Sequence, residues 1–286
     1  MLGRRGALRF LAVPPYVWLG LFFVLPLVLV IAISLRPEAG PIDFDDPWNP
    51  SLVQYETILA TPAYLRLLGI SILMALAVAG AATLLAFPIA YFLTFRARQR
   101  AALYLVLLLI PFATSYLLRV MAWRLMLGGE GAINTFLEGV GLISAPLDLL
   151  LYSRAAVVIT LTYVWIPFAA LPIYAALQRI DRGHLEAAAD LGAGPWARFA
   201  RVTVPLALPG VLAAFFMVFI PTVGEYVTPS LVGGTEGIMY GNIIQDFFGS
   251  AGSWAIGAAL SVLMLAVTLV LVLVALRLVD LRRVVA

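Results

Sequence analysis

Six long apolar runs constrain this chain more than any other feature of its sequence. They cover residues 13–35, 67–95, 101–127, 155–177, 206–223 and 254–276. About 20 apolar residues in a helix cross the hydrocarbon core of a bilayer, and a lone spanning segment satisfies its backbone hydrogen bonds only as a helix. With 63% hydrophobic and 12% charged residues, the sequence predicts an all-α membrane protein with six transmembrane helices. We expect residues 1–286 to form a single transmembrane domain.

The arginines predict the orientation of the chain. Thirteen of the 18 basic residues fall in the N-terminal tail, the turn at 96–100, the loop at 178–202 and the C-terminal tail. Basic residues accumulate on the cytoplasmic side of a membrane protein, so we expect both termini and the 178–202 loop to be cytoplasmic. The arginines ahead of the first apolar run, together with that run, resemble a signal peptide. That run is long, however, and has no convincing cleavage site before Arg36, so we expect a retained first helix.

Several residue types are missing, and their absence excludes whole classes of site. The chain has no Cys, a single His and no Lys. Thiolate metal sites are therefore excluded, and a P-loop cannot form because it requires a lysine on the nucleotide phosphates. We expect no catalytic residues, no metal and no cofactor, and no nucleic-acid partner. If transport is driven by ATP, the ATPase must be a separate chain, and this one is a transport component and not an enzyme.

The 178–202 loop has its own local pattern. Residues 185–191 can form a short helix that places the small side chains of Ala187 and Ala188 where another backbone can approach closely. Gly192 is expected to end this helix, since glycine is favoured just beyond a helix C-terminus. The same pattern also suits a helix–turn–helix at the membrane surface that only links two spans.

Two acids and a spaced motif distinguish the loop from a simple linker. Glu186 and Asp190 lie one turn apart, so a cation from elsewhere would relieve their repulsion. The run Glu-Ala-Ala that begins at Glu186 is followed by Gly192 and then by Pro205. In these residues and this spacing the chain resembles the permeases of binding-protein-dependent ABC importers. The resemblance implies that an ATPase docks on Glu186, Ala187, Ala188, Asp190, Gly192 and Pro205. His184 is either a solvated loop residue or a further ATPase contact.

The resemblance also carries expectations for the whole assembly. It implies a type I importer fold with six helices in each permease, placed in the bacterial inner membrane. The expected partners are a second, non-identical permease, two cytoplasmic ATP-binding subunits, an external substrate-binding protein and membrane lipid. Residues 111–123, 185–193, 224–234 and 239–244 are similar to the permeases of spermidine/putrescine importers. This similarity implies polyamine translocation. Related permeases carry thiamine, opines, phosphonates or ferric iron, so these solutes are alternatives, and a secondary transporter is a further one.

Four residues are candidates for the substrate path. Glu225 and Tyr226 follow the fifth apolar run, and a carboxylate beside an aromatic ring suits an organic ammonium ion through charge and cation–π attraction. Asp246 and Glu236 lie near other aromatic residues and offer the same chemistry. A local capping role, or contact with the external binding protein, is the alternative for Glu225.

Arg119 and Arg124 do not fit a polyamine path. Arg119 lies about 27 Å along the third expected helix, at 1.5 Å per residue, which places it near the outer interface. It can then extend its head group toward the interface or pair with an acid of an outer loop. If either arginine faced the path instead, it would repel polyamines and favour an anionic substrate.

Overall fold

The computed structural model describes residues 13–37, 48–147 and 150–278. Within these ranges the secondary structure is helical throughout and contains no strand, which confirms the predicted all-α fold class. In the described part of the chain, five helices are long and apolar enough to cross a membrane, and a bent pair raises the total to six if it forms one span. The terminal arginines behind the orientation prediction, such as Arg4 and Arg283, lie outside the described residues. The cytoplasmic placement of both termini stays a prediction.

The chain folds as two compact units. The first contains residues 1–66 and 243–267, and the second contains residues 67–242 and 268–286. Helices α4 and α13 each pass from one unit into the other, and α12 straddles the boundary at residue 243. The expectation of a single transmembrane domain over residues 1–286 stays a prediction.

The first unit joins the N-terminal helix to a short surface helix. A continuous helix covers Val13–Ser34 and ends in α2 (Leu25–Ser34), while α3 covers Val53–Ala60. The hydroxyls of Ser34 and Tyr55 are 2.7 Å apart, and the Gln54 amide donates to the carbonyls of Arg36 (3.2 Å) and Pro37 (3.1 Å). These bonds fix α3 against the end of α2. The unit also holds the last residues of α12 (Tyr240–Phe248) and the first part of α13 (Trp254–Leu278).

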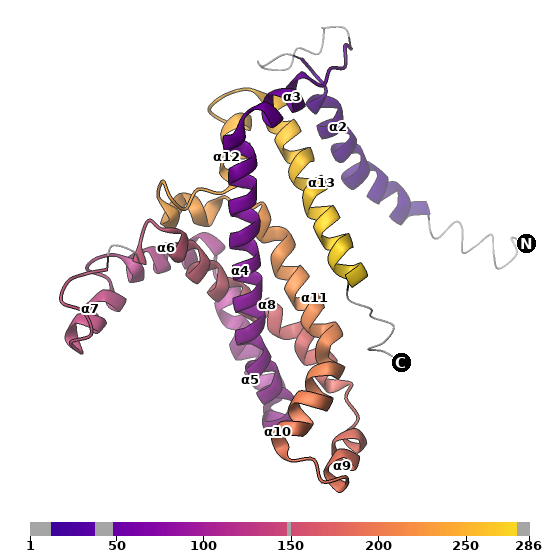
Figure 1. Cartoon of the computed structure of the whole chain (residues 1–286), viewed down its shortest axis with the longest axis vertical. Helices are drawn as coiled ribbons and strands as arrows, with labels where there is room; N and C mark the ends of the chain where they lie inside the picture. The colour runs from indigo at the N-terminus through magenta and orange to yellow at the C-terminus, as the bar shows by residue number, and fades with distance from the viewer. Residues whose placement is uncertain (1–12, 38–47, 148–149, 279–286) are drawn as a thin grey trace, which may run out of the picture. The chain divides into compact units, whose positions relative to one another are not determined.

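The second unit holds most of the helices (Figure 1). They are α4 (Pro62–Phe92), η2 (Leu93–Ala97), η3 (Arg98–Arg100), α5 (Ala101–Leu109), η4 (Ile110–Ala113), α6 (Tyr116–Leu127), α7 (Ala132–Gly139), α8 (Arg154–Gln178), α9 (Arg182–Asp190), α10 (Pro195–Arg198), η6 (Phe199–Thr203), α11 (Val204–Val223) and η7 (Pro229–Gly233). Helices α8 and α11 pack most extensively on each other. A Cβ at Gly210 would overlap the Ala176 side chain and the Pro172 carbonyl. Glycine therefore allows the two backbones to approach closely, as small residues do at helix contacts in membranes.

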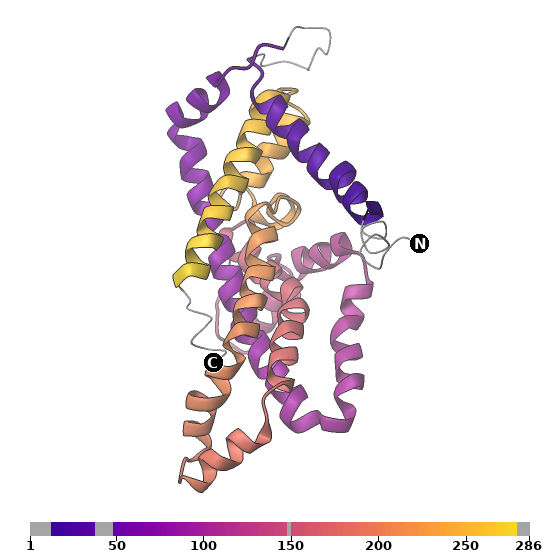
Figure 2. The same ribbon diagram turned by 90° about the vertical axis from the view of Figure 1, so that its right-hand side faces the viewer.

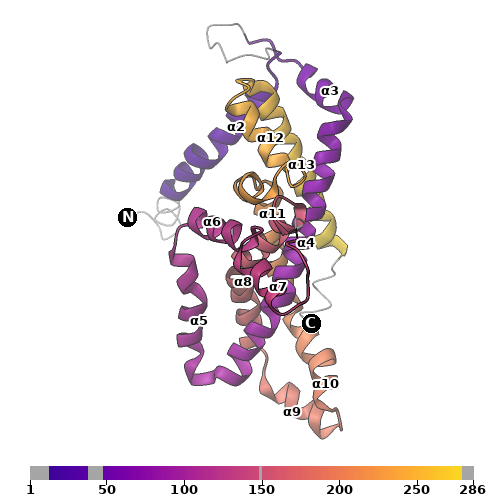
Figure 3. The ribbon, with the colours of Figure 1, turned by 90° about the vertical axis from the view of Figure 1, so that its left-hand side faces the viewer.

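The third expected span is not one straight helix. The sequence predicts a helix over 101–127, but the segments 101–113 and 116–139 meet at an angle of 86°. The reason is local: Pro111 cannot donate a backbone hydrogen bond, and Thr114 (ψ 158°) and Ser115 (ψ 136°) have extended backbone. Figure 3 shows α6 leaving the direction of α5 at this break.

Candidate functional site

The 178–202 loop contains two short helices that connect α8 to α11. Helix α8 ends at Gln178, α9 and α10 follow, and the chain returns into α11 (Figure 2). An Asp181 carboxylate oxygen accepts a hydrogen bond from the Gly183 N–H at 2.9 Å and so caps α9. Capping of this kind satisfies a backbone donor that the first helical turn leaves unpaired. The loop therefore has a defined local structure, in which α9 begins at a capped N-terminus.

Most residues of the motif on helix α9 are exposed at the surface of the chain. Glu186, Ala187 and Asp190 are exposed, while Ala188 is half-buried with Leu185. Beyond the helix, the Leu191 side chain is 89% exposed and the Trp196 ring 76%. These two side chains add exposed apolar area to the end of the loop. His184 is exposed on the same helix.

Gly192 ends α9 by a defined geometry. Its φ of +82° is in the left-handed region, which residues with a side chain rarely adopt. The Gly192 N–H donates to the Ala189 carbonyl and the Ala193 N–H to the Ala188 carbonyl, both at 2.9 Å. This pair of bonds is a Schellman motif. Pro205 is the second residue of α11 and lies inside a helix that continues from Pro195 to Val223, directly after the π-helical turn η6.

An aromatic contact ties the loop to α4. The Phe199 ring centroid lies 5.8 Å from that of Phe87 and 5.7 Å from that of Tyr91, both edge-on, and 5.3 Å from that of Trp196. In the sequence, Trp196 and Phe199 recur at a three-residue spacing that by itself suits only a helix at the membrane surface. The contact with α4 joins residues more than 100 positions apart, so no local pattern could have revealed it.

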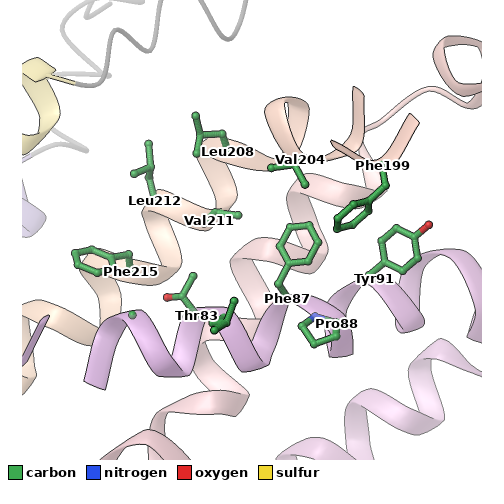
Figure 4. Close-up of a pocket in the computed structure, with 12 residues that line it drawn as sticks. Thr83, Phe87, Pro88, Tyr91, Phe199, Val204, Leu208, Val211, Leu212 and Phe215 are labelled. Carbon is green, nitrogen blue, oxygen red and sulfur yellow. The ribbon is translucent and has the colours of Figure 1, made fainter. Parts of the chain in front are cut away.

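A groove of about 700 Å³ adjoins this contact. In Figure 4, Thr83, Phe87, Pro88 and Tyr91 of α4 face Phe199 and the α11 side chains from Val204 to Phe215. Its walls are almost entirely apolar, and the buried Thr83 hydroxyl has no hydrogen-bond partner among the described residues. The groove separates the facing side chains of α4 and α11 beside the Phe199 contact.

Glu225 has a local role in the structure. One of its carboxylate oxygens accepts from the N–H groups of Val227 (2.9 Å) and Thr228 (3.2 Å). The Thr228 hydroxyl lies 2.6 Å from the Tyr116 hydroxyl, so the start of η7 is tied to the start of α6. Glu225 is half-buried. The capping contact is compatible with a second contact to substrate, which stays a prediction.

The neighbouring candidates differ in their surroundings. The Tyr226 side chain is 44% exposed, and its carbonyl accepts from the Asn242 amide at 2.9 Å. The Glu236 side chain is exposed, and its carbonyl accepts from Arg154 Nε at 2.9 Å. Asp246 is exposed on the part of α12 that belongs to the first unit. Tyr116, Thr228 and Asn242 were not expected from the sequence, because isolated uncharged polar residues carry no distinctive spacing.

Arg119 and Arg124 both have aromatic neighbours. The Arg119 guanidinium lies 4.7 Å from the Phe112 ring centroid, and that of Arg124 lies 5.8 Å from the Tyr152 ring. Arg124 also donates to the Tyr152 hydroxyl at 3.0 Å. Neither arginine is paired with an acid in the described part of the chain. No group of three or more His, Asp or Glu that could hold a metal ion occurs in residues 13–37, 48–147 and 150–278.

The family model for binding-protein-dependent transport system inner membrane components matches residues 4–283 of this sequence. A relative from Haemophilus influenzae, the spermidine/putrescine transport system permease protein PotB, is 33% identical over 86% of this chain and 84% of its own length. Two solved chains share the fold at 18% identity. One is from a bacterial ABC transporter that imports the acidic polysaccharide alginate (TM-score 0.70, 97% of this chain and 96% of that one). The other is from an alginate transporter in complex with its periplasmic protein (TM-score 0.68, 96% and 94%).

Proposed function

This chain belongs to the family of binding-protein-dependent transport system inner membrane components, and we propose that its cargo is a polyamine such as spermidine or putrescine. As a member of that family it is a permease component of an ABC importer and not an enzyme. The observation that supports a polyamine cargo is the identity with a named spermidine/putrescine permease over most of both chains. The candidate carboxylate Glu225, half-buried beside the exposed Tyr226 ring, agrees with a cationic substrate.

The proposed mechanism begins at α9. An ATPase subunit docks on the exposed Glu186, Ala187 and Asp190, and the exposed Leu191 and Trp196 supply apolar area to the same contact. When two ATPase subunits close on ATP, they displace this helical end. A charged and apolar surface of this kind suits a specific protein contact, because buried apolar anchors supply affinity while charges set orientation.

The aromatic contact then transmits the displacement. Phe199 moves with α10 and pushes on Phe87 and Tyr91 of α4, while the apolar groove gives α4 and α11 room to shift. The close contact at Gly210 keeps α8 and α11 together as one body. In this proposal α8 and α11 therefore move as a unit against α4.

The proposed partners follow the same logic. An external binding protein delivers the polyamine, in accord with the binding-protein dependence of the family. A second, non-identical permease completes the path, and two cytoplasmic ATP-binding subunits power it, since a chain without lysine cannot form its own P-loop. We place both termini and the α9–α10 end on the cytoplasmic side.

ATP hydrolysis by the reconstituted importer tests the cargo. The complex of this chain with its second permease and ATPase is placed in nanodiscs, and its binding protein is added with spermidine, putrescine, thiamine, a phosphonate or ferric iron. We expect hydrolysis to rise severalfold with the polyamines only. Stimulation by another of these solutes and none by either polyamine would overturn the proposed substrate.

A further inference from the structure

Arg119 is a buried cation that has no acidic partner among the described residues. Its side chain is 9% exposed, and its Nε has no hydrogen-bond partner among the described residues. Its neighbours are the rings of Phe112, at 4.7 Å, and Tyr116, at 5.9 Å. No acid of the described chain pairs with it. An unpaired guanidinium in such surroundings is costly, and in a membrane protein it points to a functional partner.

A cavity of about 300 Å³ is lined in part by the Arg119 side chain. Besides Arg119 it is lined by Leu107, Leu108, Pro111, Tyr163, Ile166 and Pro167. These residues come from α5, η4 and α8, so the cavity sits in the angle that the break at residues 113–116 opens. Apart from Arg119 and the Tyr163 hydroxyl, the walls are apolar. The cavity thus combines one fixed positive charge with hydrocarbon walls.

This combination selects an amphiphile over a free anion. A soluble phosphate ion carries several acceptor oxygens and would lose its hydration against apolar walls that offer few donors. An anionic phospholipid brings one phosphate for the guanidinium, which matches phosphate geometry well, and acyl chains for Leu107, Leu108 and Ile166. The surface beside the cavity is already apolar, since Leu107 is 50% exposed, Ile110 53% and Leu118 65%.

We propose that the cavity at the α5–α6 break binds an anionic phospholipid, whose phosphate is held by Arg119. The phosphate supplies the missing counter-charge to the guanidinium, and one acyl chain follows the wall formed by α5 and α8. The lipid thereby fills the angle of the broken span and stabilises it. This site is separate from the α9 surface, although Tyr116 links it to the Glu225 cluster through Thr228. Its test measures lipid binding and not transport of the substrate.

Lipid binding to the purified importer complex tests the proposal. The delipidated complex in detergent is titrated with phosphatidylglycerol or phosphatidylcholine, and bound lipid is counted by native mass spectrometry while thermal unfolding is followed in parallel. We expect phosphatidylglycerol to bind and to raise the unfolding temperature. Arg119→Gln is expected to weaken that binding by about tenfold or more, because a charge-assisted hydrogen bond is lost.

Arg124→Gln is the matched control, since Arg124 is on the same helix and beside an aromatic ring but does not line the cavity. It should bind phosphatidylglycerol as the wild type does. If Arg119→Gln prevents assembly of the complex, two further variants test whether the cavity binds the lipid. Arg119→Lys keeps the charge and should retain the preference for phosphatidylglycerol, while Leu108→Trp keeps Arg119 but fills the cavity and should lose bound lipid.

Three outcomes would overturn the proposal. The first is equal binding of phosphatidylglycerol by wild type and Arg119→Gln, or by wild type and Leu108→Trp. The second is an equal rise in unfolding temperature with inorganic phosphate alone, which would make the ligand a free anion. The third is loss of the second permease from the Arg119→Gln complex with unchanged lipid binding, which would identify the partner of Arg119 as a carboxylate of that subunit.

Discussion

Glu225 illustrates how one side chain can hold both a structural and a transport role. Its carboxylate caps the backbone at Val227 and Thr228, and it stands next to the exposed Tyr226 ring. Capping requires only an acceptor oxygen, whereas attraction of an ammonium ion requires the negative charge. The two roles can therefore be separated by a substitution that keeps the oxygen and removes the charge.

Glu225→Gln is such a substitution. Its amide oxygen still accepts from the same N–H groups, so the unfolding temperature should stay within a degree or two of the wild type. Transport of spermidine should show a KM raised by about tenfold, as expected for the loss of one charge contact worth about 1.4 kcal/mol, with kcat little changed. Glu138→Gln, at an exposed acid on α7, is the control. An unchanged KM in Glu225→Gln would leave Glu225 with its capping role only.

Phe199 is predicted to matter for coupling more than for stability. Each of its two edge-on contacts with α4 is worth about 0.5–1.5 kcal/mol, so Phe199→Ala should still assemble with the ATPase. Its ATP hydrolysis, however, should no longer rise when loaded binding protein is added. Phe136→Ala removes an exposed ring on α7 (66% exposed) and should respond normally. Normal stimulation of Phe199→Ala would show that the displacement travels by another route.

At the scale of elements, the α8–α11 contact is the rigid part of the second unit. Gly210→Ala adds a Cβ where the Ala176 side chain and the Pro172 carbonyl leave no room. We expect it to cost about 1–3 kcal/mol, as overpacking does in other cores, and to lower the unfolding temperature of the complex. Gly69→Ala is the matched control because a Cβ there meets nothing within 4 Å. It should be neutral or stabilising, since alanine favours helix. Equal unfolding temperatures for the two variants would contradict the close α8–α11 contact.

The elements also show what the sequence can and cannot predict. The end of α9 was predictable, because Gly192 acts through its own backbone. The break in the third span was only partly predictable: Pro111 indicates a weak point, but the extended conformations of Thr114 and Ser115 leave no mark in composition. The Phe199 contact and the burial of Arg119 depend on which helices pack together. Those arrangements arise from the tertiary structure and have no local sequence signal.

At the scale of the whole molecule, the absence of cysteine makes the proposed orientation directly testable. Ala189 on α9 and Thr135 on α7 are both exposed. The proposed orientation places Ala189 on the cytoplasmic side and Thr135, which follows the third expected span, on the outer side. A single cysteine at position 189 should react with a membrane-impermeant maleimide only in inside-out vesicles. A cysteine at position 135 should react only in right-side-out vesicles. The reverse pattern would invert the orientation and remove α9 from reach of a cytoplasmic ATPase.

The central claim is that this chain moves polyamines and is driven through α9 by a separate ATPase. ATP-dependent uptake of labelled spermidine into proteoliposomes that contain the complete importer tests it most directly. Wild type and Glu138→Arg should accumulate spermidine, and Glu186→Arg should lose at least about nine-tenths of the uptake together with the co-purifying ATPase, as a reversed charge in a docking contact costs tenfold or more. Full uptake by Glu186→Arg, or no uptake by the wild type, would contradict the account.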